Sequence, residues 1–328
     1  EGRSGRAGRS GRRPGSRPPT IHHPPEPSEY PPFLYPPTRI PDSPEYPHPA
    51  RPVHHPSTRA PAARIPKQNF FRATRSEWIK IRTLRSTWIT SMIAVFLTVL
   101  FGAGSAIAYA KTEGMSDSAA GGLITGTTFG EIVVAVLGAL VITGEYSSGQ
   151  IRSTLAAVPR RTRVFAAKSL VIAIWSFLLG VISLLLSWLV AAPFMGDEAP
   201  SFSDTHIVGF IWGTGLAFAG IALLSLGMGY LVRSTAGAIT VVVILLFIIS
   251  IPLSLMAMKW HWAANVSSVM PSSVVQSVTD PFTVSGQTTW ADTNPSLFLT
   301  HTQAVLIFGA WVLVPLIAGW FVFSKRDA

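Results

Sequence analysis

Six apolar runs, each long enough to cross a bilayer as a helix, dominate the sequence from residue 88 onwards. Backbone polar groups find no water inside lipid, so such runs cross membranes as helices. The pattern therefore predicts an all-α integral membrane protein with six transmembrane helices, at about 88–110, 121–143, 168–193, 207–232, 235–257 and 303–323.

The stretch before the first run, residues 68–86, has an amphipathic pattern. On a helical wheel its large apolar side chains fall within about 140° of one another, while Glu77 and Arg85 interrupt this side. We predict an interfacial helix that lies on the cytoplasmic leaflet and leads into the first span. An ordinary basic juxtamembrane segment is the alternative. The residues that define the predicted interfacial helix are Trp78, Ile81, Arg82, Leu84 and Arg85.

The N-terminal part of the chain differs from the rest in composition. Residues 1–66 contain 18 of the 26 prolines, within Arg/Gly/Ser-rich and Pro/Tyr/His-rich runs. Such a segment buries too little apolar surface to offset the entropy of ordering. We therefore predict a disordered Pro/Arg-rich tail over 1–67 and a six-helix membrane domain over 68–328.

Charge and candidate ligands narrow the function classes. The net charge is +10, but the basic residues after the tail lie mostly beside apolar runs, which favours anionic lipid headgroups over nucleic acid as the partner. Cysteine is absent, which excludes thiolate catalysis and thiolate metal sites. The paired histidines at 22–23 and 54–55 lack nearby acids at ligand spacing, so we expect no metal site.

The distribution of basic residues predicts the topology. After residue 66, fourteen Lys and Arg fall in segments that alternate with loops 111–120, 194–206 and 258–302, and those loops hold only Lys111 and Lys259. Basic residues are retained on the cytoplasmic side during insertion. We therefore expect both termini to be cytoplasmic and the three loops to be outside. Within the last loop, 270–278 is expected to form a short helix at the outer interface.

Glu131 is the one ionisable residue well inside a predicted span. A charge within a membrane is costly, so this carboxylate is a candidate functional group. The alternative, which we favour, is a structural residue that faces other helices. Gly122, Gly126 and Gly130 precede it at four-residue spacing, which predicts close helix packing.

The connector between the second and third runs, 143–168, is strongly basic and contains one acid, Glu145. Its interior favours a short helix that ends at Pro159, because proline lacks an amide hydrogen. Glu145 precedes this helix and has three candidate partners: the amides at its N-terminus, Arg152, or a basic residue of another protein.

Sequence motifs of common catalytic sites are missing. The chain has no G-x-x-x-x-G-K-[ST] phosphate loop, no H-E-x-x-H and no G-x-S-x-G. We therefore expect no enzyme activity and no bound cofactor in this chain.

Three stretches carry a resemblance to a known family: SEWIKIRTLRSTWI at 76–89, LGALVITGEYSSGQIRSTLAAVPRRTRVFAAKSL at 137–170, and GYLVRSTAGAI at 229–239. Together they resemble the membrane subunit of a type-2 ABC exporter, in a form similar to permeases of high-GC Gram-positive bacteria. The resemblance covers about residues 70–328 and leaves the tail unexplained.

The resemblance implies six helices that form half of a dimeric transmembrane unit in a bacterial plasma membrane. It implies a pair of ABC ATPase subunits that bind ATP and Mg, and a second permease subunit, identical or different. The N-terminal helix and the connector dock on the ATPases in that family, with Gln150 standing where a small residue or Thr is usual. The coupling positions carried over to this chain are Glu145, Tyr146, Gly149, Gln150, Ile151, Arg152 and Pro159.

The function expected from these observations is that of a permease in an ATP-driven exporter that works by alternating access. Apolar spans with few charges suit an amphiphilic or lipid-like substrate. A stand-alone secondary transporter or channel is the alternative, although that class usually has several intramembrane charges or broken half-helices. A non-transporting membrane scaffold that uses the Pro-rich tail for binding is a third hypothesis.

Overall fold

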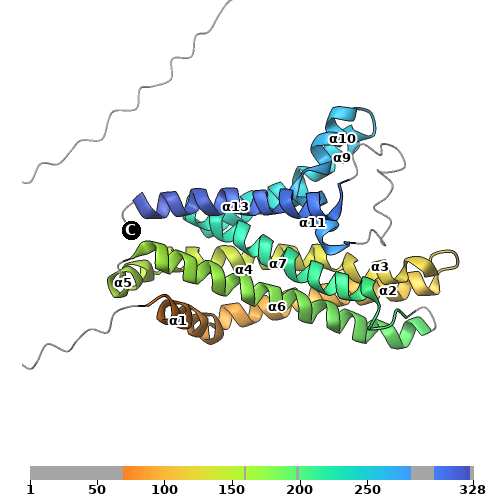
Figure 1. The fold of residues 1–328 in the computed structure, drawn as a ribbon, viewed down its shortest axis with the longest axis horizontal. Helices are drawn as coiled ribbons and strands as arrows, with labels where there is room; N and C mark the ends of the chain where they lie inside the picture. The colour runs from red at the N-terminus through yellow and green to blue at the C-terminus, as the bar shows by residue number, and fades with distance from the viewer. Residues whose placement is uncertain (1–68, 159, 197–198, 282–298, 326–328) are drawn as a thin grey trace, which may run out of the picture. The chain divides into compact units, whose positions relative to one another are not determined.

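The computed structural model describes residues 69–158, 160–196, 199–281 and 299–325, and the regular secondary structure in these ranges is helical (Figure 1). The predicted tail, 1–67, lies outside the described residues. The helices are α1 Phe70–Thr83, α2 Arg85–Lys111, α3 Ala119–Thr125, α4 Thr127–Ser147, α5 Gln150–Ala157, α6 Arg161–Met195, α7 Thr205–Val232, α8 Thr235–Val243, α9 Ser250–Ala257, α10 His261–Ser268, α11 Pro271–Thr279 and α13 His301–Lys325.

Six helical stretches in this part of the chain are long and apolar enough to cross a membrane. They are α2, α3 with α4, α6, α7, α8 through α9, and α13. The fifth contains a π-helical turn at Ile244–Ile248 between α8 and α9. These helices confirm the predicted class, an all-α membrane protein with six spans.

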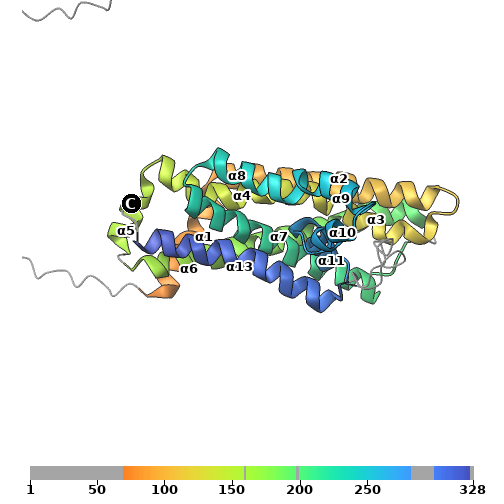
Figure 2. The same cartoon turned by 90° about the horizontal axis from the view of Figure 1, so that it is seen from above.

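Helix α7 is the centre of the bundle and packs against α4, α6 and α13 (Figures 1 and 2). Its mid-section is almost entirely buried, including Phe218, Ile221 and Ala222. Helix α2 packs on the other side, against α3, α4 and α6. The core therefore lies around α7, while the outward sides of α2, α6 and α13 expose large apolar side chains suited to lipid.

Several glycines lie where two helices approach so closely that a larger side chain would not fit. A Cβ on Gly122 would lie 2.7 Å from the backbone of Ala106 in α2, and one on Gly126 would overlap the carbonyl oxygen of Thr98. A Cβ on Gly130 would overlap the Thr98 side chain. The predicted small-residue face is thus confirmed, because all three glycines let α3 and α4 approach α2.

The segment after the fifth span forms two short helices, α10 and α11. Helix α11 covers the predicted short helix at 270–278 and packs against α7 and α13. A Cβ on Gly213 of α7 would lie 2.7 Å from the carbonyl oxygen of Thr279, so this contact is tight. Helix α10 was not predicted.

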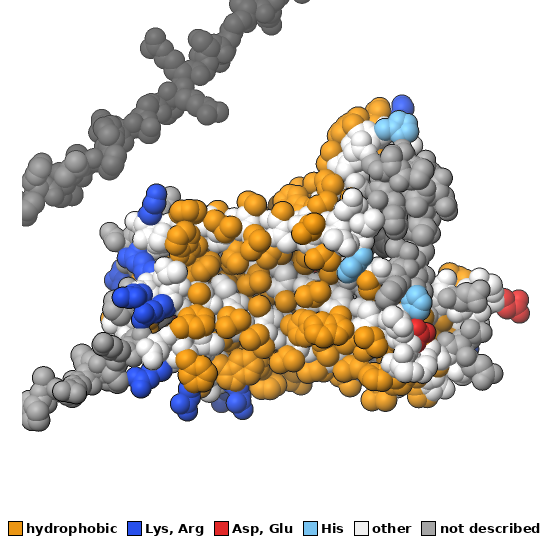
Figure 3. All heavy atoms as spheres, in the orientation of Figure 1, with side chains coloured by type: hydrophobic (Ala, Val, Ile, Leu, Met, Phe, Trp, Pro, Cys, Tyr) orange, Lys and Arg blue, Asp and Glu red, His pale blue; other side chains and the backbone are white. Residues whose placement is uncertain are grey.

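Basic side chains gather at one end of the described helices. Figure 3 shows Lys and Arg side chains over the end where α1, α5 and the last turn of α13 lie, with apolar side chains covering the middle. An apolar band that ends in a cluster of basic residues is the pattern expected of a membrane protein at its cytoplasmic boundary.

Candidate functional site

Helix α1 presents a narrow stripe to the bundle. Ala73, Glu77 and Ile81, spaced four residues apart, are buried. The predicted apolar face is therefore only partly correct, since Phe71 and Leu84 are exposed. The reason is that the buried stripe includes a charged residue, Glu77, which pairs with Lys168 of α6.

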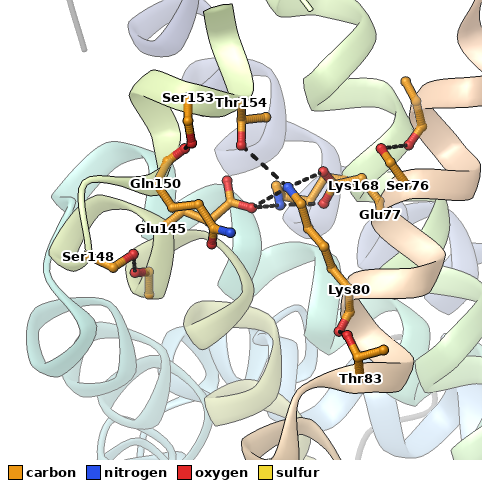
Figure 4. Close-up of polar contacts among 12 residues, drawn as sticks. Ser76, Glu77, Lys80, Thr83, Glu145, Ser148, Gln150, Ser153, Thr154 and Lys168 are labelled. Carbon is orange, nitrogen blue, oxygen red and sulfur yellow. Dashed lines mark hydrogen bonds and ion pairs between the residues drawn. The ribbon is translucent and has the colours of Figure 1, made fainter. Parts of the chain in front are cut away.

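Four charged side chains meet where α1, α4 and α6 converge (Figure 4), and we call them the ion cluster: Glu77, Lys80, Glu145 and Lys168. Lys168 Nζ lies 2.6 Å from Glu77 Oε2 and 2.9 Å from Glu145 Oε1. Lys80 Nζ lies 2.7 Å from Glu77 Oε1 and 2.9 Å from the same Glu145 oxygen. Two acids and two bases thus form a closed ring with no net charge.

Burial makes this ring sensitive to the loss of any member. The side chains of Glu77, Glu145 and Lys168 are buried, and that of Lys80 is 27% exposed. Burial alone would raise the pKa of the Glu77 carboxyl, but the ammonium groups of Lys168 and Lys80 outweigh it and hold that pKa below its usual value. Burial likewise opposes the charge of Lys80, yet Glu77 and Glu145 raise its pKa.

The connector begins directly beside the ion cluster. Glu145 lies in the last turn of α4, and the chain then turns at Gly149, whose φ of 70° favours glycine, into α5. Lys80 Nζ also reaches Thr154 Oγ1 of α5, at 3.4 Å. A short polar link therefore joins α1, the end of α4, the start of α6 and the connector helix.

Two expectations for the connector need correction. Glu145 does not cap α5, which has no side-chain cap at its N-terminus, and its ion pairs are with Lys80 and Lys168 rather than Arg152. Ile151, expected at the exposed start of the helix, is buried in the main core cluster. The reason is that the apolar side of α5 packs back onto the bundle.

The outward side of α5 carries the remaining predicted residues. Gln150 and Arg152 are exposed, together with Ser153, Ala156 and Ala157. Pro159 lies outside the described residues. This surface is small and mixed in polarity. Helix α5 lies at the end of the bundle (Figure 1) where Figure 3 shows the Lys and Arg side chains.

Other contacts tie this end of the bundle together. The guanidinium of Arg233, at the turn between α7 and α8, lies over the ring of Tyr146, 5.1 Å from its centroid. Arg161, the first residue of α6, donates to the carbonyl oxygen of Phe323 in α13, at 3.0 Å. The connector is therefore anchored to the α7–α8 turn and to α13.

The remaining predicted residues of the interfacial helix differ in burial and in the helix to which they belong. Trp78 is half-buried, and its ring makes an edge-on contact with that of Trp175 in α6, with 5.7 Å between the ring centroids. Arg82 is exposed, and Arg85 begins α2. Helix α1 is thus held to α6 by Trp78 and Glu77.

Glu131 lies in the first half of α4, 14 residues before Glu145 of the ion cluster, and is buried among helices. This position agrees with the favoured structural interpretation, that the side chain faces other helices. The candidate functional role of this carboxylate remains a prediction.

Sequence reasoning missed the ion cluster as a unit. Glu77 and Lys80 were available as an i,i+3 acid–base pair, and Lys168 stood at the edge of an apolar run. The signal was Glu77 itself, an acid on the side of the helix that carries the apolar residues. Its partner on another helix could not be found from the sequence, because Lys168 lies 91 residues further along the chain.

The fold and this site define a class: a six-span, all-helical membrane protein with a helix at the basic end and a structured connector between its second and third membrane segments. The model of a family described as ABC-2 family transporter protein matches residues 73–254, which is more than half of the chain. The chain belongs to this family and is an ABC-2 type permease. The comparison with curated proteins finds none that matches.

Proposed function

We propose that this chain is the permease subunit of an ATP-driven exporter, in which a separate pair of ATPase subunits docks on α1 and α5. The proposal rests on the family match together with one observation, the buried ion cluster that links α1, α4 and α6 where the connector begins. The ATP and Mg sites belong to the partner subunits, and a second permease subunit completes the translocation path. The proposed location is a bacterial plasma membrane, with both termini cytoplasmic.

The ion cluster suits the transmission of movement. A partner that pushes α5 acts on a helix whose inner side is anchored by Ile151 in the core and whose Thr154 reaches Lys80. Lys80 also pairs with Glu145 at the end of α4, and Lys168 of α6 pairs with Glu77 and Glu145, so α5 is linked through α1 and α4 to α6 and these helices move as one unit. Switching of this kind needs two conformations that the partner binds with different affinity.

The docking part of the proposal is tested by purification from native membranes. A tagged full-length chain should retain an ATP-hydrolysing protein in fixed ratio. Arg152→Glu with Ala156→Glu, both on the exposed side of α5, should weaken that retention. Thr112→Glu, at an exposed position beyond the other end of α2, is the matched control. Absence of any ATPase from the purified wild type would contradict the proposal.

The transmission part needs a different readout. The chain lacks cysteine, so a single Ser201→Cys reports exposure of the segment after α6 to a thiol reagent. In the complex with its ATPase, addition of ATP should change the labelling rate. With Glu145→Gln in the same chain, hydrolysis should continue while ATP no longer changes that rate. A full ATP response in the Glu145→Gln complex would show that the ion cluster does not transmit movement.

A further inference from the structure

A groove of about 250 Å³ lies between the first turns of α6 and the C-terminal part of α13. Its lining residues are Thr162 and Phe165 from α6, and Leu316, Ile317 and Trp320 from α13. Four of these five side chains are apolar. Thr162 and Ile317 are exposed, so the groove opens on the outer surface of the bundle.

The apolar lining of the groove continues along the outward side of α13. Leu313, Val314 and Phe321 are exposed there, on a helix that is long and apolar enough to span a membrane. This surface therefore faces lipid hydrocarbon. A flexible hydrocarbon chain can fill a narrow groove between two helices, where it gains van der Waals contacts on both sides.

Basic residues flank the end of the groove. Arg160, Arg161 and Arg163 lie at the start of α6, and Lys325 is the last residue of α13. The side chains of Arg160 and Lys325 are exposed. Neither helix contains an acid, so an anionic group at this end meets only positive charge from these two helices.

The apolar lining and the basic residues are close together on both helices. Arg161 directly precedes Thr162 of the lining, and its guanidinium donates to the carbonyl oxygen of Phe323 at 3.0 Å, which ties α6 to the last turn of α13. Lys325 follows Trp320 by five residues, which is about 7.5 Å along the helix axis. A molecule with an acyl chain in the groove thus places its polar end among these bases.

This arrangement matches a phospholipid at the membrane boundary. The chain lies in the apolar band, and the headgroup lies at the level where basic side chains begin (Figure 3). Basic sites between membrane helices attract anionic headgroups. A zwitterionic headgroup gains less, because its own ammonium group is repelled by the same bases.

We propose that the groove between α6 and α13 binds one acyl chain of an anionic phospholipid from the leaflet at the basic end, with the headgroup phosphate against Arg160 and Lys325. This binding depends neither on the ATPase nor on the proposed export function.

Trp320 lines the groove, so its fluorescence reports contact with a lipid chain. The purified full-length protein is reconstituted in phosphatidylcholine vesicles with a rising fraction of phosphatidylglycerol whose acyl chains carry bromine, which quenches tryptophan on contact. Brominated phosphatidylcholine is the zwitterionic comparison. The same titrations of Trp320→Phe give the signal of the other tryptophans, and the difference is the signal of Trp320.

We expect half-maximal quenching of Trp320 at a mole fraction at least about fivefold lower for phosphatidylglycerol than for phosphatidylcholine, which corresponds to the attraction of one basic residue to an anionic surface. Equal mole fractions would overturn the proposal. Absence of Trp320 quenching by either lipid would also overturn it, because another occupant, such as a second copy of the chain, would then cover the groove.

A charge variant and its control complete the test. Arg160→Gln with Lys325→Gln should bring the value for phosphatidylglycerol close to that for phosphatidylcholine. Arg72→Gln with Arg75→Gln removes two exposed bases of α1 that lie outside the groove lining, and should leave it unchanged. Equal effects of the two variants would contradict a specific site and indicate general surface attraction. The vesicles contain this chain alone, so failure here leaves the ATPase docking test unaffected.

Discussion

Lys168 is the member of the ion cluster whose removal should be most destabilising. Its ammonium is buried and contacts both carboxylates, Glu77 and Glu145. Lys168→Met keeps a side chain of similar length and leaves two buried acids sharing Lys80 alone. The chain should still insert, because the spans keep their apolar character, but it should be less stable.

The magnitude follows from the geometry. At 2.6–2.9 Å and an effective dielectric constant of about 20, each contact of Lys168 has a Coulomb attraction of about 6 kcal/mol before desolvation is subtracted. Breaking a buried pair by removing one partner costs about 3–5 kcal/mol, because the other charge is left buried and uncompensated. For a domain of this size that corresponds to a fall in melting temperature of about 6–20 °C.

A double-mutant cycle separates this effect from simple loss of packing. Glu77→Gln combined with Lys168→Met leaves one acid and one base, so the pair of changes should cost at least about 1.5 kcal/mol less than the sum of the single changes. Thermal unfolding of the purified protein in detergent provides the measurement, with Lys111→Met at an exposed position as the control. Additive effects of the two changes would refute the idea that these charges depend on each other.

Three more predictions follow from the packing, the topology and the charges. Gly138→Leu should prevent assembly of the bundle, because a Cβ there would overlap the carbonyl oxygen of Ala222 in α7. Gly104→Leu, where a Cβ meets no atom within 4 Å, should fold normally. Gel filtration distinguishes the two proteins, and a monodisperse Gly138→Leu protein would contradict the α4–α7 contact. In intact cells an impermeant thiol reagent should label Ser201→Cys and not Ser148→Cys, and the reverse pattern would invert the topology. The contribution of Glu77 to stability should be complete above its ordinary pKa of 4.5 and should be lost as pH falls through its lowered folded-state pKa. The contribution of Lys80 should be complete below its ordinary pKa of 10.5 and should be lost as pH rises through its raised folded-state pKa. Melting temperature measured against pH should therefore lose its acid-side dependence on this carboxyl in Glu77→Gln, and an unchanged acid side would contradict the assignment.

The spans were predictable from the sequence because the constraint is local. A membrane-length apolar run has one stable conformation in lipid, and Gly122, Gly126 and Gly130 marked close packing by their spacing alone. The family was predictable for a similar reason, since its motif in the connector is a continuous stretch of sequence.

The partners of Glu145 were not predictable, because tertiary contacts decide them. The nearest base along the connector is Arg152, and a local rule favours it or the amides of α5. The fold instead brings Lys80 from 65 residues earlier and Lys168 from 23 residues later. Burial of Ile151 was missed because an eight-residue helix with a mixed surface shows too little periodicity to reveal which side faces the bundle.

The central claim, that an ATPase docks on the outward side of α5, is tested most directly by cross-linking from one position. A photoreactive thiol reagent attached to Ala156→Cys, an exposed site on α5, should join the full-length chain to an ATP-binding protein in native membranes. The same reagent on Ser201→Cys, beyond the opposite end of α6, should not. An ATP-binding protein captured from Ser201→Cys, or from neither position, would contradict the account.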